Sequence, residues 1–222
     1  MAIAFDAATT RARVGSGSNS FTYSHTCSGS DRILFVGVTV VNPSGNTATG
    51  VTYNGAAMTK IATAAAQSNV LITLWCLVNP ASGSNTISVS TASNIGAYAD
   101  SLATSYSGAS DTGQPDAFDF SNGTSTTISE SVTTTVDDCW TVAVCWSNGN
   151  PAASTGSTSR SEVSDRTMLA DSNSPITSAG LTTMNFTAGI PDNYGIVMAS
   201  FAPAGAAPDP AQAARRGAVM MM

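Results

Sequence analysis

Ile33-Leu-Phe-Val-Gly-Val-Thr-Val-Val41 and Val70-Leu-Ile-Thr-Leu-Trp-Cys-Leu-Val-Asn79 are the two stretches that decide the fold. Both are apolar on the two faces that a period of two residues defines. Their short length and their β-branched residues favour strands over helices. We therefore expect both stretches to be central strands of a sheet that is covered on each side.

The segments 139–146 and 21–27 alternate more cleanly and predict two further strands. In the first, Trp140, Val142, Val144 and Trp146 share one face, and Cys139, Thr141, Ala143 and Cys145 share the other. In the second, Phe21, Tyr23, His25 and Cys27 share a face. The apolar face of each strand is expected to point into the core.

The rest of the chain repeats the same pattern of short strands and turns. We predict further strands at 2–8, 50–54, 57–64, 85–92, 97–107, 125–134, 158–170, 181–187 and 194–202. Clusters of Gly, Pro, Asn and Ser separate many of them and supply the backbone angles of tight turns. This pattern predicts an all-β, jelly-roll-like antiparallel β-sandwich over residues 1–204, followed by a short C-terminal extension.

The composition indicates a weakly charged surface. Only 22 of the 222 residues are charged, or 10%, against about 25% in an average soluble domain. The 31 Ser and 29 Thr residues supply polarity instead. The net charge of −6 disfavours a nucleic-acid partner, which needs clustered Lys and Arg.

The sequence also disfavours a membrane segment and a secretory signal. No apolar run reaches the roughly 18 residues that a membrane helix needs. The start, Met1-Ala-Ile-Ala-Phe-Asp6, lacks both a basic region and an apolar stretch. We expect no membrane association.

Residues 205–222 differ in composition from the rest and form an Ala/Pro/Met-rich tail. Residues 211–216 are compatible with one or two helical turns, capped by Asp209, and a disordered tail is the alternative. An ordered apolar end needs a surface to bury itself on, and methionine fills irregular gaps. We therefore favour a tail that docks on a neighbouring subunit or partner, with the contact made by Arg215, Arg216, Val219, Met220, Met221 and Met222.

Two clusters combine residue types that bind metals, and neither predicts a site. His25 and Cys27 lie two apart on one strand face, but zinc commonly takes four ligands, and Cys76, Cys139 and Cys145 show no close-pair spacing. The loop 111–119 gathers three Asp residues, as calcium loops do, but Asp is also common in turns. We expect no metal and no cofactor.

The four cysteines are expected to be buried free thiols. Cys139 and Cys145 lie about 20 Å apart along an extended strand and cannot bond each other. A chain made in a reducing compartment keeps its thiols, and oxidation after release from the cell is the alternative. With one histidine and no acid–base pair in a motif, we expect no enzyme activity.

Five segments in order carry a family resemblance. They are Asp31-Arg-Ile-Leu-Phe-Val-Gly-Val-Thr-Val-Val41, Gly50-Val-Thr-Tyr-Asn-Gly-Ala-Ala-Met-Thr-Lys60, Leu74-Trp-Cys-Leu-Val-Asn-Pro80 with Gly83-Ser-Asn-Thr-Ile-Ser-Val89, Ser105-Tyr-Ser-Gly-Ala109, and Tyr194-Gly-Ile-Val-Met-Ala-Ser-Phe-Ala-Pro203. Over residues 5–204 the chain resembles a β-sandwich module that recurs in phage virion proteins and in bacterial surface or secreted proteins. The resemblance implies a structural or adhesive role and brings no catalytic motif.

A phage virion protein reconciles the composition of an exported protein with the missing export signal, because it is assembled in the host cytoplasm and released by lysis. We expect a head decoration or cement protein on the outside of the particle, bound to the major capsid protein or other virion proteins. Such a protein is expected to form a homo-oligomer, for which a trimer is a common arrangement. The alternative is a tail-fibre or head-fibre adhesin that recognises host glycans, and a bacterial surface protein is a further reading.

Overall fold

The computed structural model describes residues 1–206, except 43–44 and 164–165, and this part of the chain is all-β. Its fifteen strands are β1 (Ala4–Gly15), β2 (Ser20–Cys27), β3 (Ile33–Val41), β4 (Ala48–Tyr53), β5 (Ala56–Ala57), β6 (Thr59–Gln67), β7 (Val70–Val78), β8 (Gly83–Thr91), β9 (Tyr98–Ser107), β10 (Ala117–Thr133), β11 (Trp140–Ser147), β12 (Pro151–Ala153), β13 (Thr158–Val163), β14 (Thr167–Asp171) and β15 (Leu181–Phe201). All of their pairings are antiparallel, as the sequence predicts.

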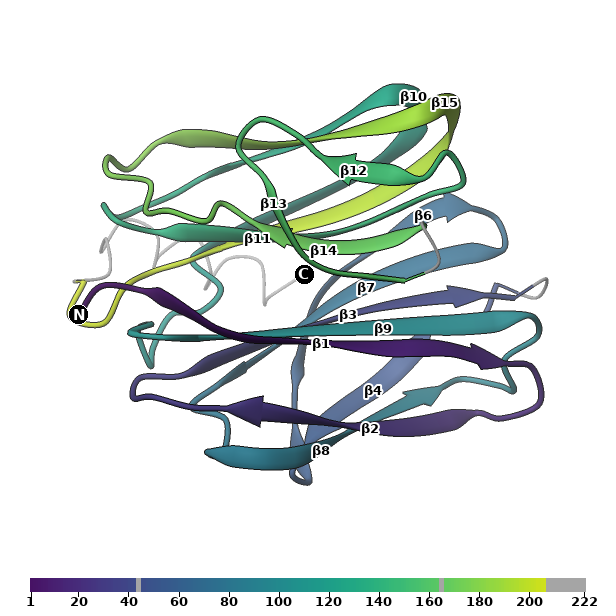
Figure 1. Cartoon of the computed structure of the whole chain (residues 1–222), viewed down its shortest axis with the longest axis horizontal. Helices are drawn as coiled ribbons and strands as arrows, with labels where there is room; N and C mark the ends of the chain where they lie inside the picture. Colours follow the sequence, from purple (N-terminus) through teal and green to yellow (C-terminus); the bar gives the residue numbers. More distant parts are fainter. Residues whose placement is uncertain (43–44, 164–165, 207–222) are drawn as a thin grey trace, which may run out of the picture.

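The strands form three sheets that stack in layers (Figure 1). The central sheet has the order β1-β9-β3-β7-β6. The small sheet, β2-β8-β4-β5, covers one of its faces, and the large sheet, β10-β15-β11-β14-β13 with β12 attached to β15, covers the other. The predicted antiparallel sandwich is therefore confirmed, with a third layer that the strand pattern alone did not indicate.

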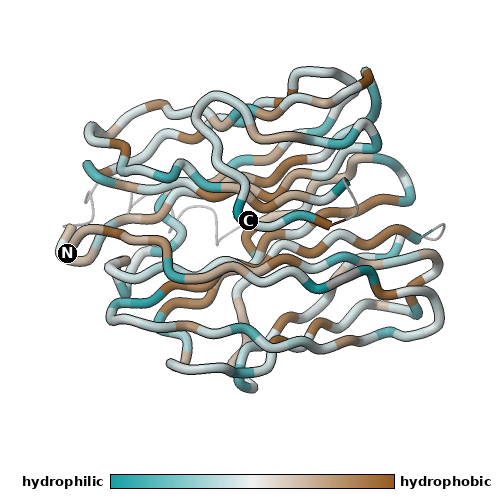
Figure 2. The backbone as a smooth tube through the Cα atoms, viewed as in Figure 1, coloured by the Kyte–Doolittle hydropathy of each residue, from teal (hydrophilic) through white to brown (hydrophobic). Residues whose placement is uncertain are grey.

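The strand β3 lies in the middle of the central sheet and is buried along its whole length. Leu34 and Val36 pack against the small sheet, and Phe35 packs against the large sheet. Its neighbours are β7 and β9, and β7 is buried from residue 72 to residue 76. Hydrophobic backbone segments accordingly run through the interior in Figure 2. The two deciding stretches are central strands covered on both sides, as predicted.

A third core lies on the outer face of the large sheet. The long strands β10 and β15 pair along almost their whole lengths, and the pairing shifts register between Ser125 and Thr127. Beyond this shift, the β10–β15 pair packs Ile128, Met184 and Phe186 against the outward side chains of β11 and β14. The large sheet is therefore folded back on itself.

Several strand boundaries differ from the sequence prediction. The single strand expected at 158–170 is the antiparallel pair β13 and β14. The two strands expected at 181–187 and 194–202 are one continuous strand, β15, because β10 pairs with both halves. The strand expected at 125–134 begins at Ala117, and the one expected at 2–8 continues to Gly15.

Candidate docking groove

The amino terminus lies beside the segment that follows the last strand (Figure 1). The Met1 ammonium nitrogen donates a hydrogen bond to the Ala204 carbonyl at 2.8 Å, and the Ala204 N–H donates to the Gly108 carbonyl at 2.8 Å. Gly108 has a φ of +75°, and a Cβ atom there would lie 2.2 Å from the carbonyl oxygen of Ala2. Only glycine fits this approach, which joins the start of the chain to the end of the sandwich.

A groove of about 610 Å³ opens at this junction. Four separate parts of the chain line it, namely Met1, Ala2 and Ile3, then Val136, Asp137, Asp138 and Trp140, then Pro175, and finally Pro203, Ala204, Gly205 and Ala206. Its volume lies in the range of about 300–1,000 Å³ that is usual for ligand pockets. We call this feature the end groove.

Hydrogen bonds from backbone N–H groups fix the two connections that form one wall of the end groove. Asp138 has a φ of 60°, and its N–H donates to the Ile176 carbonyl at 2.8 Å. The Ile176 N–H donates to the Cys139 carbonyl at the same distance. The Asp137 carboxylate accepts a hydrogen bond from the Ala179 N–H at 2.8 Å. These bonds hold the β10–β11 connection against the β14–β15 connection.

The end groove combines an apolar wall with two carboxylates. Ile3 and Trp140 are buried, and Met1 is 69% exposed at the rim. Asp137 and Asp138 are exposed, and no Lys or Arg occurs among the described residues of the lining. Such a surface suits a partner segment that carries both apolar and cationic side chains.

The predicted docking residues Arg215, Arg216, Val219, Met220, Met221 and Met222 lie outside the described residues. The structure nevertheless places the root of the tail, because Gly205 and Ala206 line the end groove. Sequence reasoning identified the tail but missed the groove, since the four lining parts are far apart in the chain.

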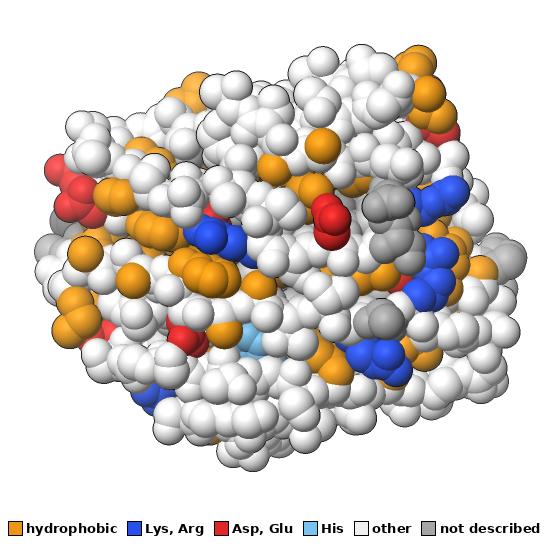
Figure 3. Space-filling view, viewed as in Figure 1, with side chains coloured by type: hydrophobic (Ala, Val, Ile, Leu, Met, Phe, Trp, Pro, Cys, Tyr) orange, Lys and Arg blue, Asp and Glu red, His pale blue; other side chains and the backbone are white. Residues whose placement is uncertain are grey.

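The outer surface carries few charges. Figure 3 shows a face that is mostly uncharged, with acidic side chains at the end of the molecule where the amino terminus lies. The low share of charged residues in the sequence agrees with this view.

His25 and Cys27 both lie buried on β2, in a packed face as predicted. The Thr9 hydroxyl lies 2.8 Å from His25 Nδ1, and Nε2 has no hydrogen-bond partner in the described part of the chain. Burial lowers the pKa of His25 from 6.5 to about 4. Among the described residues, no group of three or more His, Cys, Asp and Glu is placed to hold a metal ion.

The four cysteines are buried and unpaired. Burial raises the pKa of Cys76 and of Cys139 to about 12, and it raises the pKa of Cys145 further. A thiol with such a pKa stays protonated at neutral pH and is a poor nucleophile. The expected buried thiols are confirmed.

Asp116, one of the three Asp residues of the loop 111–119, is buried. Its carboxylate accepts hydrogen bonds from the Thr135 N–H and the Ser200 hydroxyl, both at 3.0 Å, and from the Thr135 hydroxyl. These contacts tie the β9–β10 connection to the β10–β11 connection and to β15. The Asp116 carboxylate therefore has a structural role, in which it holds these parts of the chain together by hydrogen bonds.

The aromatic side chains on the surface are not the tryptophans. Trp75, Trp140 and Trp146 are buried, as predicted. Phe118 and Phe120 on β10 are 51% and 47% exposed, and their register with β15 places both on one face of the strand. Sequence reasoning missed this pair because it began the strand at residue 125.

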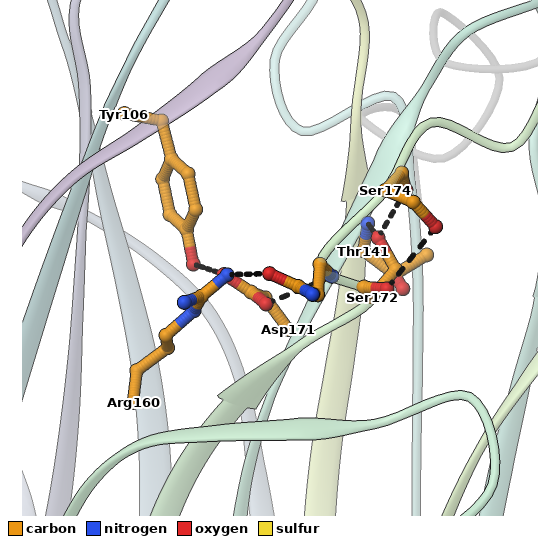
Figure 4. A network of polar contacts seen from close by, with 7 residues as sticks. Tyr106, Thr141, Arg160, Asp171, Ser172 and Ser174 are labelled. Atoms are coloured by element: carbon orange, nitrogen blue, oxygen red, sulfur yellow. Dashed lines mark hydrogen bonds and ion pairs between the residues drawn. The ribbon is translucent and has the colours of Figure 1, made fainter.

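A buried polar network joins the central and large sheets (Figure 4). The Tyr106 hydroxyl donates to Asp171 at 2.9 Å, and Arg160 Nε donates to the same carboxylate at 2.7 Å. Arg160 also donates to Asn173 Oδ1 at 2.6 Å and stacks its guanidinium over the Phe5 ring. No local sequence pattern predicts this network, since Tyr106 and Phe5 lie on strands far along the chain from Arg160 and Asp171.

Comparisons with protein-family models, with curated proteins and with solved structures found no match. Within the described ranges, the chain contains no helix with the length and hydropathy needed to cross a membrane.

Proposed function

We propose that this protein is a structural protein on the exterior of a phage particle, and specifically a head decoration or cement protein. The observation that carries this proposal is the end groove, where an apolar and acidic surface lies at the root of a tail with cationic and apolar residues. A contact surface of this kind acts by burial and hydrogen bonding repeated by symmetry, and it needs no catalytic residue.

The partners proposed are the major capsid protein or other virion proteins, together with further copies of this chain, for example in a trimer. The weakly charged sandwich supports this proposal, as does the resemblance described for residues 5–204. The proposed location is the virion, after assembly in the host cytoplasm and release by lysis.

Electron microscopy of the native particle tests the proposal. We expect many copies of the sandwich on the head lattice, with the end groove turned toward a neighbour. Absence of the protein from the virion would contradict the proposal. A second test adds purified protein to particles that lack it and measures their thermal stability, which should rise because the protein binds only the assembled lattice.

A fibre adhesin is the second candidate, and one observation favours it. Phe118 and Phe120 form an exposed aromatic pair on one face of β10. Aromatic faces contribute large contact areas at binding surfaces. Glycan-array binding that is lost in a Phe118→Ser/Phe120→Ser variant, together with location at fibre tips, would support the adhesin over the decoration protein.

A further inference from the structure

The arginine side chains of the C-terminal tail complement the acidic side chains of the end groove. Among its described lining residues, the groove presents two exposed carboxylates, Asp137 and Asp138, and no Lys or Arg, and the Met1 ammonium at its edge donates to the Ala204 carbonyl. The segment 207–222 contains Arg215 and Arg216, and its only acidic residue is Asp209. The charges of groove and tail are therefore complementary.

The end groove and the tail also each carry apolar side chains that can pack against one another. The groove wall includes Ile3, Trp140 and Pro175, and the tail ends in Val219-Met-Met-Met222. A volume of about 610 Å³ admits a few side chains of this size rather than a folded partner. The unbranched, flexible methionine side chain suits an irregular groove of this kind.

The tail is covalently attached at the end groove, where we expect it to bind. Ala206 lines the groove, and Arg215 follows only nine residues later. Nine residues span at most about 30 Å, so Arg215 always lies within that distance of the groove wall. A short tether gives an effective concentration of the order of millimolar, which favours the tail of the same chain over that of a second copy at micromolar protein.

We propose that the C-terminal segment folds back onto the end groove of its own chain. Arg215 and Arg216 pair with Asp137 and Asp138, while the terminal Val-Met-Met-Met covers the apolar wall. This contact is a property of the isolated chain. A role for this contact in assembly rests on the proposed function. In that role the tail leaves the groove of its own chain and binds a neighbouring subunit.

Limited trypsin digestion of the full-length protein tests the contact, because trypsin cleaves after Arg215 and Arg216. In a Asp137→Asn/Asp138→Asn variant we expect cleavage there to be roughly fivefold faster, the effect of losing two partly exposed ion pairs. Asparagine keeps an oxygen for the Ala179 N–H and tolerates the positive φ of Asp138.

The matched control is Asp111→Asn/Asp119→Asn, which removes two exposed carboxylates outside the groove lining. It should be cleaved at the wild-type rate. Raising the salt concentration should accelerate cleavage in the wild type more than in the groove variant. A hydrogen-exchange measurement of the tail amides provides a second readout that does not depend on trypsin.

Two outcomes would overturn the inference. Equal cleavage and exchange of the tail in wild type and groove variant would mean that the tail does not bind the groove. Protection that rises with protein concentration would assign the groove to the tail of a second copy. Both results are independent of whether the protein occurs on a virion, so they are distinguishable from failure of the proposed function.

Discussion

His25 is the only histidine of the chain, and its surroundings make it sensitive to acid. The side chain is 1% exposed, with Thr9 at Nδ1 and the Tyr53 ring beside it. The protonated imidazolium carries an N–H on both ring nitrogens, and Nε2 has no hydrogen-bond partner among the described residues. Protonation therefore buries a charge whose Nε2–H is unpaired, although the nearby Asp6 offsets part of this cost.

We predict that His25 makes the fold less stable in mild acid. Its pKa is about 4 in the folded chain and 6.5 in the reference state, so the unfolded chain binds the proton more tightly. The free energy of unfolding should be fully retained above pH 6.5 and should fall by about 3 kcal/mol as the pH drops to 4. Urea unfolding across this range measures the loss.

A His25→Gln variant is the control for this prediction. It should lack the His25 part of the pH dependence, while other groups still titrate. Burial raises the pKa of Asp100, so this group increases the free energy of unfolding as the pH falls, in the wild type and in the variant. A wild-type curve with the same slope as the variant between pH 6.5 and pH 4 would contradict the prediction.

At the scale of the element, β3 and β15 show what a local sequence pattern predicts about a strand and what it does not. The period-two pattern of 33–41 predicted a strand buried on both faces, and β3 is such a strand. The strands predicted at 181–187 and 194–202 left out the segment 188–193, which contains Gly189 and Pro191. In the structure these residues lie in the bulged part of β15, where the register with β10 shifts and proline needs no ladder partner.

Gly37 offers a test of sheet packing within β3. A Cβ atom at this position would lie 2.7 Å from Cγ2 of Val144 on β11 in the large sheet. We expect Gly37→Ala to lower the free energy of unfolding by about 1–3 kcal/mol, the usual cost of overpacking a core. Thermal or urea unfolding measures the change.

The matched variant for this test is Gly50→Ala in β4. No heavy atom lies within 4 Å of a Cβ built at Gly50, and its φ is not in the left-handed region. We expect a neutral or slightly stabilising effect there. An equal loss in both variants would show that the cost comes from the strand backbone and not from the approach of the two sheets.

At the scale of the whole molecule, buried polar contacts fix how the central and large sheets meet. Asp171 is fully buried and accepts hydrogen bonds from Tyr106 of the central sheet and Arg160 of the large sheet. A second buried carboxylate, Asp100, lies 3.4 Å from Arg13 and accepts a hydrogen bond from Thr167. The hydrophobic layers alone do not specify this alignment.

We predict that Asp171→Asn costs about 3 kcal/mol of stability, because it leaves the Arg160 guanidinium largely buried without its counter-charge. Tyr106→Phe is the comparison, and it should cost about 1 kcal/mol, since Arg160 still compensates the carboxylate. Urea unfolding at neutral pH measures both. Equal losses would mean that the ion pair contributes no more than one neutral hydrogen bond.

Deletion of residues 205–222 is expected to leave a folded monomer and to weaken assembly. The last strand ends at Phe201, and the three hydrophobic cores lie entirely before the deleted segment. Thermal unfolding of the truncated chain checks the fold, and binding to particles that lack the protein checks assembly. Unchanged affinity for the particle would refute a docking role for the tail.

The sequence by itself determined the class of fold, the buried strands and the burial of the tryptophans and cysteines. These properties depend on neighbours along the chain, because side chains two apart share a face of a strand. Only the tertiary structure decided the third layer, the continuity of β15, the Tyr106–Asp171–Arg160 network and the end groove. Each of these depends on strand order and register between segments that are distant in the chain, and a local periodicity carries no information about either.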